Sequence, residues 1–183
     1  ESVAGLLSWD QETMMPTGGT SLRAEQMAAL SQLVNQRFTS SKFGELLARA
    51  EEESAASGDP DVEANLREIR RDYDRAVRLP TSLVREFAEV STHAQVNWRK
   101  ARENSDFPSF APWLERLVGL CRAKAECLMT DGITDPYDAL LDEYEPGARA
   151  ADVAAAFSSL RVRLTPLIRE ITDSGREPDT AVR

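Results

Sequence analysis

Apolar residues recur at steps of three and four along almost the whole chain, and this spacing limits what the chain can fold into. One such stripe follows residues 18–19 and consists of Leu22, Met27, Leu30, Leu33, Val34 and Phe38. Residues at these steps lie on one face of a helix. No segment alternates with period two over any length, so we expect no sheet. The sequence therefore predicts an all-α fold, an array of long antiparallel helices.

Prolines and acidic residues indicate where several helices begin and end. Asp59-Pro60 and Asp135-Pro136 each read as an N-cap followed by a proline at the first helical position. Ser109 is the expected cap after a turn over residues 103–112, and Pro166 is expected to kink or end the last helix. No linker is rich enough in glycine or serine to divide the chain. Residues 1–183 are therefore predicted to form a single helical region.

The composition argues against several classes of partner. Of the 183 residues, 42% are hydrophobic and 29% are charged, as in ordinary soluble globular proteins. The net charge of −9 argues against nucleic acid or an anionic membrane surface as the main partner. No apolar run approaches the length of a membrane span, and no signal peptide is visible. Cys121 and Cys127 would lie ~9 Å apart along one helix, too far for a disulfide, so we expect a cytoplasmic protein with free thiols.

The residues that could bind a metal are few and poorly placed. A zinc site of the H-E-x-x-H kind needs two histidines on adjacent helical turns, and His93 is the sole histidine in the sequence. A partly buried histidine with a local hydrogen bond is the favoured interpretation of His93, and a functional imidazole is the alternative. Asp138, Asp142 and Glu145 share a helical face, but no Glu-x-x-His partner exists for a two-metal site. A solvated or ion-paired face is favoured there.

Two short stretches place polar residues where they could contact a ligand. In the first, residues 6–16, a helix would point Asp10 to the same side as Leu6, and a buried carboxylate needs a partner. That stretch is either a polar joint between helices or part of a site. In the second, residues 97–104, Trp98 and Arg102 could grip a carboxylate or stack a cation on the indole. A helix end with basic residues favoured by the helix dipole is the preferred interpretation.

Three blocks of sequence resemble, in order, the M32 metallocarboxypeptidases, the carboxypeptidase Taq family. The first block contains Trp9-Asp10, Glu12-Thr13, Met15-Pro16, Gly18-Gly19 and Arg23-Ala24-Glu25. The second contains Trp98, Ala101-Arg102, Asp106-Phe107, Phe110, Pro112 and Leu114, and the third spans residues 136–147. Three ordered blocks make a more specific resemblance than a single motif.

The resemblance implies a zinc metallocarboxypeptidase, which removes single residues from the C-termini of peptides. In that family an H-E-x-x-H motif and a further glutamate bind zinc, and the first glutamate of the motif activates a zinc-bound water. The chain contains neither, so we expect the N-terminal part of such an enzyme, a helical wall over the substrate groove. We expect this part to be inactive by itself, to contribute no catalytic or metal-binding residue and to bind no zinc. The implied partners are peptides with a free C-terminus and a second copy in a homodimer.

The same resemblance suggests which residues could line the groove. The candidates are Trp9, Asp10, Gln11, Trp98 and Arg102. For Asp10 a structural role is favoured, as a carboxylate that caps or pairs across a joint between helices. Two other functions stay open: an acidic helical scaffold or binding module without catalysis, and the N-terminal region of an oligoendopeptidase-type zinc peptidase.

Overall fold

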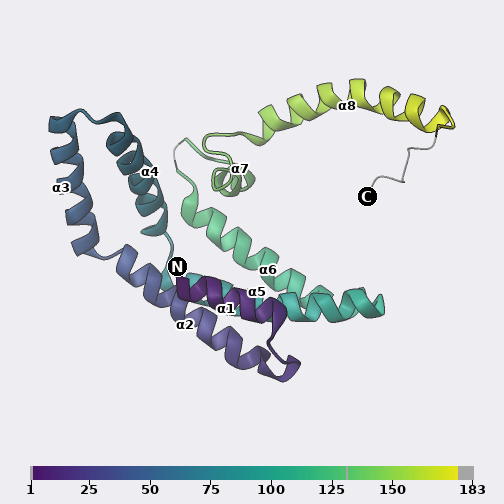
Figure 1. Cartoon of the computed structure of the whole chain (residues 1–183), viewed down its shortest axis with the longest axis horizontal. Coiled ribbons are helices and arrows are strands. Elements are labelled where there is room, and N and C mark those ends of the chain that lie inside the picture. The colour runs from purple at the N-terminus through teal and green to yellow at the C-terminus, as the bar shows by residue number, and fades with distance from the viewer. Residues whose placement is uncertain (1, 131, 177–183) are drawn as a thin grey trace. The chain divides into compact units, whose positions relative to one another are not determined.

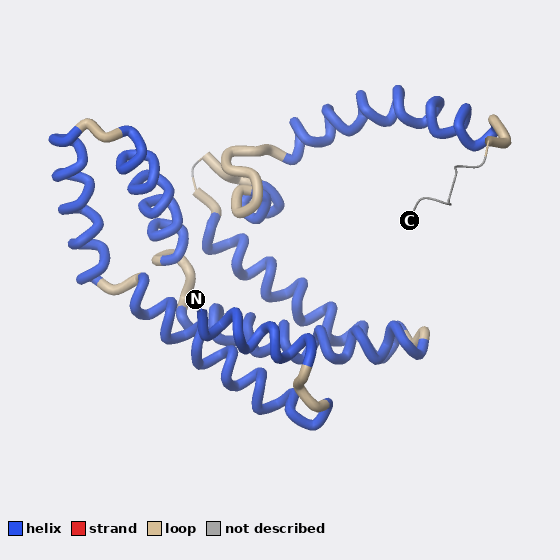
Figure 2. Tube along the Cα trace, in the orientation of Figure 1, coloured by secondary structure: helices blue, strands red, loops and turns tan. Residues whose placement is uncertain are grey.

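The computed structural model describes residues 2–130 and 132–176, and these residues form helices and loops without a strand (Figures 1 and 2). The elements are α1 (Ser2–Thr13), a short 3₁₀ turn η1 (Thr17–Gly19), α2 (Thr20–Phe38), α3 (Ser41–Ser57), α4 (Pro60–Ala76), α5 (Thr81–Asn104), α6 (Phe107–Leu128), α7 (Pro136–Leu141) and α8 (Ala150–Asp173). The predicted all-α fold is confirmed.

The helix starts follow the local chemistry of the sequence with one exception. The carboxylates of Asp59 and Asp135 accept hydrogen bonds from backbone N–H groups in the first turns of α4 and α7, as predicted. The prediction that Ser109 caps α6 is wrong. Asp106 is the cap, and its carboxylate accepts from the Ser109 backbone N at 3.3 Å. The helix can start at Phe107 because a proline is tolerated in the first turn, where its missing N–H has no helical partner.

Pro166 does not end α8, which continues to Asp173 and curves gently in Figure 1. Proline removes one backbone hydrogen bond, the one that would reach Val162 four residues earlier. Val162 is exposed, so water can replace the lost donor. Of the two predicted effects of this proline, a kink or an end of the helix, the end is wrong, and the helix bends instead.

The structure divides into two compact units, Glu1–Thr130 and Asp131–Arg183. In the first unit α5 lies between α2 and α6, and α1 lies along α2. The buried apolar side chains of α2 and α5, which pack against each other, are small: Ala24, Ala28, Val90, Ala94 and Ala101. Small residues at a contact allow helix axes to approach closely. The expectation of a single helical region over residues 1–183 stays a prediction.

Helices α3 and α4 form an antiparallel hairpin in the first unit (Figure 1). Phe38, Phe43 and Tyr73 meet at one end of this hairpin, with ring centroids 4.8–6.0 Å apart. Arg70 of α4 binds Glu51 of α3 through two hydrogen bonds, from Nε at 2.8 Å and from Nη2 at 2.7 Å. The hairpin is therefore held by an aromatic cluster and a bidentate ion pair.

In the second unit, Asp138 connects α7 to the start of α8. Its carboxylate accepts from the Ala150 backbone N at 2.7 Å and pairs with Arg149 at 3.6 Å. Asp142 accepts from the Gly147 backbone N at 2.9 Å. These two carboxylates thus serve local structure, in line with the favoured interpretation of a paired acidic face.

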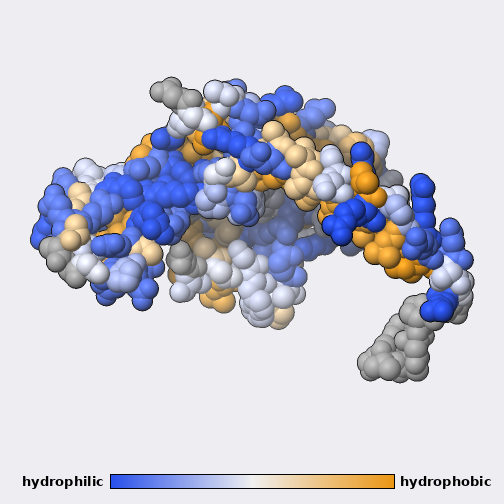
Figure 3. Space-filling view, turned by 90° about the horizontal axis from the view of Figure 1, so that it is seen from above, coloured by the Kyte–Doolittle hydropathy of each residue, from blue (hydrophilic) through white to orange (hydrophobic). Residues whose placement is uncertain are grey.

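Helix α8 presents its apolar residues to solvent. Figure 3 shows hydrophobic side chains beside charged ones along this helix, and the exposed members are Phe157, Leu160, Val162, Leu164, Leu167, Ile168 and Ile171. Contiguous exposed apolar residues are a common feature of interaction surfaces. Among the described residues, no helix combines the length and hydropathy that crossing a membrane requires.

Candidate functional site

Asp10 lies at a joint between α1 and α2, where it pairs with Arg23. The Arg23 guanidinium donates one hydrogen bond to the Asp10 carboxylate and another to the Leu7 backbone carbonyl. Arg23 is buried at 9% exposure, so its charge has been removed from water and needs this partner. The polar joint predicted from the sequence is present, and the carboxylate has its partner; the arginine is buried, whereas the Asp10 side chain is 36% exposed.

A second polar network connects α1 to α5. Gln11 Nε2 donates to Gln95 Oε1 at 2.8 Å, and Gln95 Nε2 donates to Glu12 Oε1 at 2.6 Å. Arg99 Nη2 donates to the other oxygen of Glu12 at 2.7 Å. Glu12, Gln95 and Arg99 were not predicted as partners, because residues 83–87 positions apart give no local signal of contact. Gln11 therefore takes part in helix pairing.

Trp9 lies outside both networks. Its side chain is 58% exposed, and its backbone carbonyl accepts a hydrogen bond from the Thr13 hydroxyl. An exposed indole on an outer helix is available for contact with another surface. Within the described residues, the Trp9 side chain takes part in neither hydrogen-bond network of α1.

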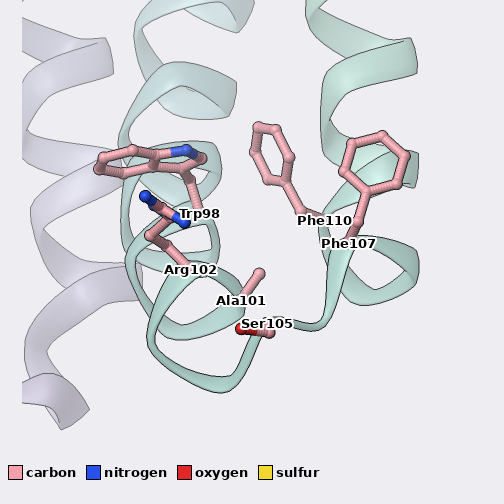
Figure 4. A pocket seen from close by; sticks show the side chains of 6 residues that line it. All are labelled: Trp98, Ala101, Arg102, Ser105, Phe107 and Phe110. Carbon is pink, nitrogen blue, oxygen red and sulfur yellow. The ribbon is translucent and has the colours of Figure 1, made fainter.

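Trp98 and Arg102, the two other candidates, line one hollow at the turn between α5 and α6 (Figure 4). Its full lining is Trp98, Ala101, Arg102, Ser105, Phe107 and Phe110. In Figure 4 the Trp98 indole faces the rings of Phe107 and Phe110 across the hollow, and the Arg102 side chain lies beside the indole. Neither Trp9 nor Asp10 nor Gln11 contributes to it. The structure thus divides the five candidates between the α1 joints and this hollow.

A tight turn creates the hollow by placing the last turn of α5 beside the first turn of α6. Ser105 caps α5 in the left-handed conformation, with φ of 53°, and its backbone N–H donates to the Arg102 carbonyl at 3.4 Å. Asp106 then caps α6 immediately. Because two residues connect the helices, aromatic side chains from both ends are brought to one place. Phe107 and Phe110 were not predicted as lining residues. Two aromatic residues three positions apart, directly after the turn, could have indicated that both rings lie on one face of α6.

The Arg102 guanidinium has no hydrogen bond or ion pair to any side chain in the described part of the chain. Arg99, on the same helix, is neutralised by Glu12. Asp106 is close in sequence, but its carboxylate caps α6. The hollow therefore combines three aromatic rings with one positive charge that is available to an anion.

The remaining chemically active side chains form no site. His93 stacks on Trp113 with ring centroids 5.4 Å apart. It is half-buried as expected, but among the described residues its ring makes a stacking contact in place of the expected local hydrogen bond. Cys121 and Cys127 are free thiols. Within residues 2–130 and 132–176, no group of three or more histidine, cysteine, aspartate or glutamate side chains could hold a metal ion. The described residues thus do not fit a zinc site.

The carboxypeptidase Taq (M32) metallopeptidase family matches this chain over residues 1–182. The chain belongs to this family. Thermostable carboxypeptidase 1 of Thermus thermophilus is 40% identical over an alignment of 190 positions, gaps included, which covers 99% of this chain and 37% of the relative. Carboxypeptidase 1 of Bacillus subtilis is 30% identical and covers 99% of this chain and 35% of the relative. The chain spans about a third of the length of these curated relatives.

Solved structures of family members have the same arrangement of helices. The crystal structure of BsuCP matches 98% of this chain and 35% of its own chain, with a TM-score of 0.87 and 28% identity. The structure of the Pyrococcus furiosus carboxypeptidase, described as Apo-Mg, matches 96% of this chain and 35% of its own, with a TM-score of 0.74 and 32% identity. The resemblance found in the three sequence blocks is therefore confirmed, and a metal cofactor is expected for a metallopeptidase family.

Proposed function

We propose that this chain is the N-terminal helical part of a metallocarboxypeptidase that removes residues from the C-termini of peptides. The supporting observation is the family match over residues 1–182 together with relatives that are all named carboxypeptidases. The substrates would be peptides with a free C-terminal carboxylate. The chain's own contribution would be a helical wall beside the peptide, with Trp98 and Arg102 among the residues that contact it.

The metal in this proposal is zinc, held by residues that this chain does not supply. The described residues offer no metal-binding cluster, and the one histidine stacks on Trp113. We further propose a cytoplasmic protein, since both cysteines are free thiols, and a homodimer. Size-exclusion chromatography with light scattering on the complete protein would test the dimer.

Hydrolysis of matched peptides tests the proposed activity. The complete protein that carries this chain is incubated with N-blocked peptides that end in a free carboxylate or in an amide. A carboxypeptidase releases single residues from the free-carboxylate peptide alone, and a chelator abolishes the release until zinc is restored. Internal cleavage of the amidated peptide would indicate an endopeptidase instead. No cleavage of either peptide would support a helical scaffold without catalysis.

A further inference from the structure

Helix α1 turns polar side chains toward the neighbouring helices and apolar side chains toward solvent. Val3, Leu6 and Trp9 are 60%, 63% and 58% exposed. Asp10 and Gln11 instead form hydrogen bonds with α2 and α5. A surface helix usually has the opposite arrangement, with its apolar stripe against the core, and no residue of α1 is buried. The attachment of α1 therefore gains little from apolar burial, which supplies most of the stability of helices in proteins.

Two polar joints hold α1 in place, and each depends on a carboxylate of α1 and an arginine of another helix. At the first joint, Asp10 accepts a hydrogen bond from the buried Arg23 of α2. At the second joint, Glu12 accepts from Arg99 of α5 at 2.7 Å, and these side chains are 45% and 44% exposed. Exposed ion pairs contribute little stability and are weakened by salt.

The second joint is also incompletely hydrogen-bonded. Gln11 donates to Gln95 of α5, but its Oε1 is buried and has no hydrogen-bond partner among the described residues. A buried acceptor without a partner lowers the stability of the closed arrangement. A segment with few buried apolar contacts and partly exposed polar ones belongs to the low-stability end of a fold, where local opening occurs.

We propose that α1 is a strap that detaches from α2 and α5 as one unit while the other helices stay folded. Residues 14–19, which connect α1 to α2, are its hinge (Figure 1). A free helix of 12 residues is marginal in water, so the detached strap loses its helical hydrogen bonds. Detachment uncovers Arg23 and releases Arg99 from its carboxylate. The strap therefore controls access to two cations of α2 and α5, independently of the proposed peptidase activity.

A single detaching unit couples the two joints. Within the described residues, Glu12 forms no hydrogen bond or ion pair with Arg23. Loss of the Glu12 carboxylate should nevertheless make Arg23 accessible more often, because the whole strap opens more often. Fraying of α1 from its N-terminus, or two joints that open independently, would produce no such coupling.

Modification of Arg23 by phenylglyoxal in the complete protein measures this coupling. Mass mapping gives the rate at Arg23 relative to Arg122, which is exposed on α6. Glu12→Gln should accelerate modification of Arg23 about fivefold, the effect of an exposed ion pair at the upper end of the usual range. Glu103→Gln, at an exposed carboxylate of α5, is the control and should leave the rate unchanged. Added salt should accelerate modification of the parent more than that of Glu12→Gln, which has already lost the screened pair.

Hydrogen exchange of the same proteins shows whether α1 opens as a unit. Asp10→Asn and Glu12→Gln should each accelerate exchange by a similar factor along the whole of α1 and leave exchange in α5 and α6 unchanged. Acceleration confined to the N-terminal end of α1 would indicate fraying and overturn the proposal. Equal acceleration in α5 would indicate a general loss of stability, and an unchanged rate at Arg23 in Glu12→Gln would show that the joints are independent. Either result would also overturn it.

Discussion

Arg23 is a buried cation whose carboxylate partner is Asp10. Its guanidinium is buried between α1 and α2 and donates to the Asp10 carboxylate and to the Leu7 carbonyl. Removal of one partner from a buried ion pair leaves the other charge without compensation, which costs more than the pair contributes. The side chain of Asp10 is 36% exposed, so water can reach part of the gap that its removal would leave.

We expect Asp10→Ala to lower the free energy of unfolding of this chain by ~1–3 kcal/mol, because Arg23 loses its carboxylate partner. Urea unfolding followed by circular dichroism measures this change. Glu25→Ala, which removes an exposed carboxylate from α2, is the control and should change stability little. In the complete protein, peptide turnover per folded molecule should be nearly unchanged. A variant of normal stability whose turnover fell a hundredfold would place Asp10 in the substrate site.

At Gly44, alanine would be the better helix former, but its Cβ would collide with a neighbouring side chain. A Cβ added there would lie 2.5 Å from the Tyr73 hydroxyl oxygen, and Tyr73 is held among Phe38 and Phe43. At Gly119, inside α6, the corresponding position has no atom within 4 Å apart from the local helix backbone and the chain neighbours. The two glycines therefore provide a matched pair, since alanine is favoured over glycine in both helices by propensity alone.

Gly119→Ala should stabilise the chain by ~0.5–1 kcal/mol, the usual gain in a helix interior. Gly44→Ala should destabilise it, because overpacking typically costs ~1–3 kcal/mol and exceeds that gain. Tyr73→Phe, which removes the clashing oxygen, should recover part of the loss in the double variant. Thermal unfolding measures all three. Equal stabilisation by both glycine substitutions would show that α3 and α4 separate easily at this end.

At the scale of elements, the α3–α4 hairpin has a defined pH dependence. The Arg70 guanidinium donates two hydrogen bonds to Glu51 and so holds the pKa of that carboxyl below its ordinary value. A carboxylate with a lowered pKa in the folded state stabilises that state above the unfolded pKa. This contribution is lost as the pH falls through the folded pKa. The pair is about one-third exposed, so salt screens part of the effect.

We therefore expect Glu51→Gln to be less stable than the parent chain at pH 7, with the difference shrinking as the pH falls from about 5 to 3. Melting temperatures of both proteins across this range measure the effect. Glu45→Gln, at an exposed position of the same helix, is the control and should follow the parent at each pH. If the melting temperature of Glu51→Gln stayed below that of the parent chain at pH 3, the loss of stability would be due to packing and not to the lost charge.

At the scale of the whole molecule, the apolar stripe of α8 determines how the chain behaves in solution. Leu160, Leu164 and Leu167 are 53%, 41% and 50% exposed. Burial of apolar surface contributes ~25 cal/mol per Å², whereas repulsion from the net charge of −9 is screened beyond ~8 Å at physiological salt. Association through this stripe should therefore prevail over charge repulsion.

We expect this chain to self-associate or to bind a hydrophobic dye strongly, and increasingly so as the salt concentration rises. Substitution of Leu160, Leu164 and Leu167 by glutamine should reduce both effects. The control variant carries glutamine at Ala151, Ala154 and Ala155, which are exposed on the same helix. These substitutions should change neither self-association nor dye binding. Light scattering and dye titration provide the measurements. A monomer with no excess dye binding would mean that the stripe is covered within the chain itself.

The sequence by itself determined the features that depend on neighbours within about four residues. Helical periodicity indicated the all-α class, and an acidic residue before proline indicated the caps at Asp59 and Asp135, because capping is a contact within one turn. The same kind of local rule failed at Ser109, where Asp106 could also reach the first free N–H groups. The three ordered blocks also indicated the family, because the order and spacing of residues along a chain are properties of its sequence.

Only the tertiary structure decided which distant residues meet. Asp10 needed a partner on energetic grounds, but Arg23 became that partner through the packing of α1 on α2. Glu12 and Arg99 lie 87 positions apart, and no local pattern connects them. The hollow around Arg102 likewise depends on the turn at Ser105, which brings Phe107 and Phe110 opposite Trp98. Periodicity specifies which face of a helix is apolar, whereas the identity of the surface it meets is set by the packing of all the helices together.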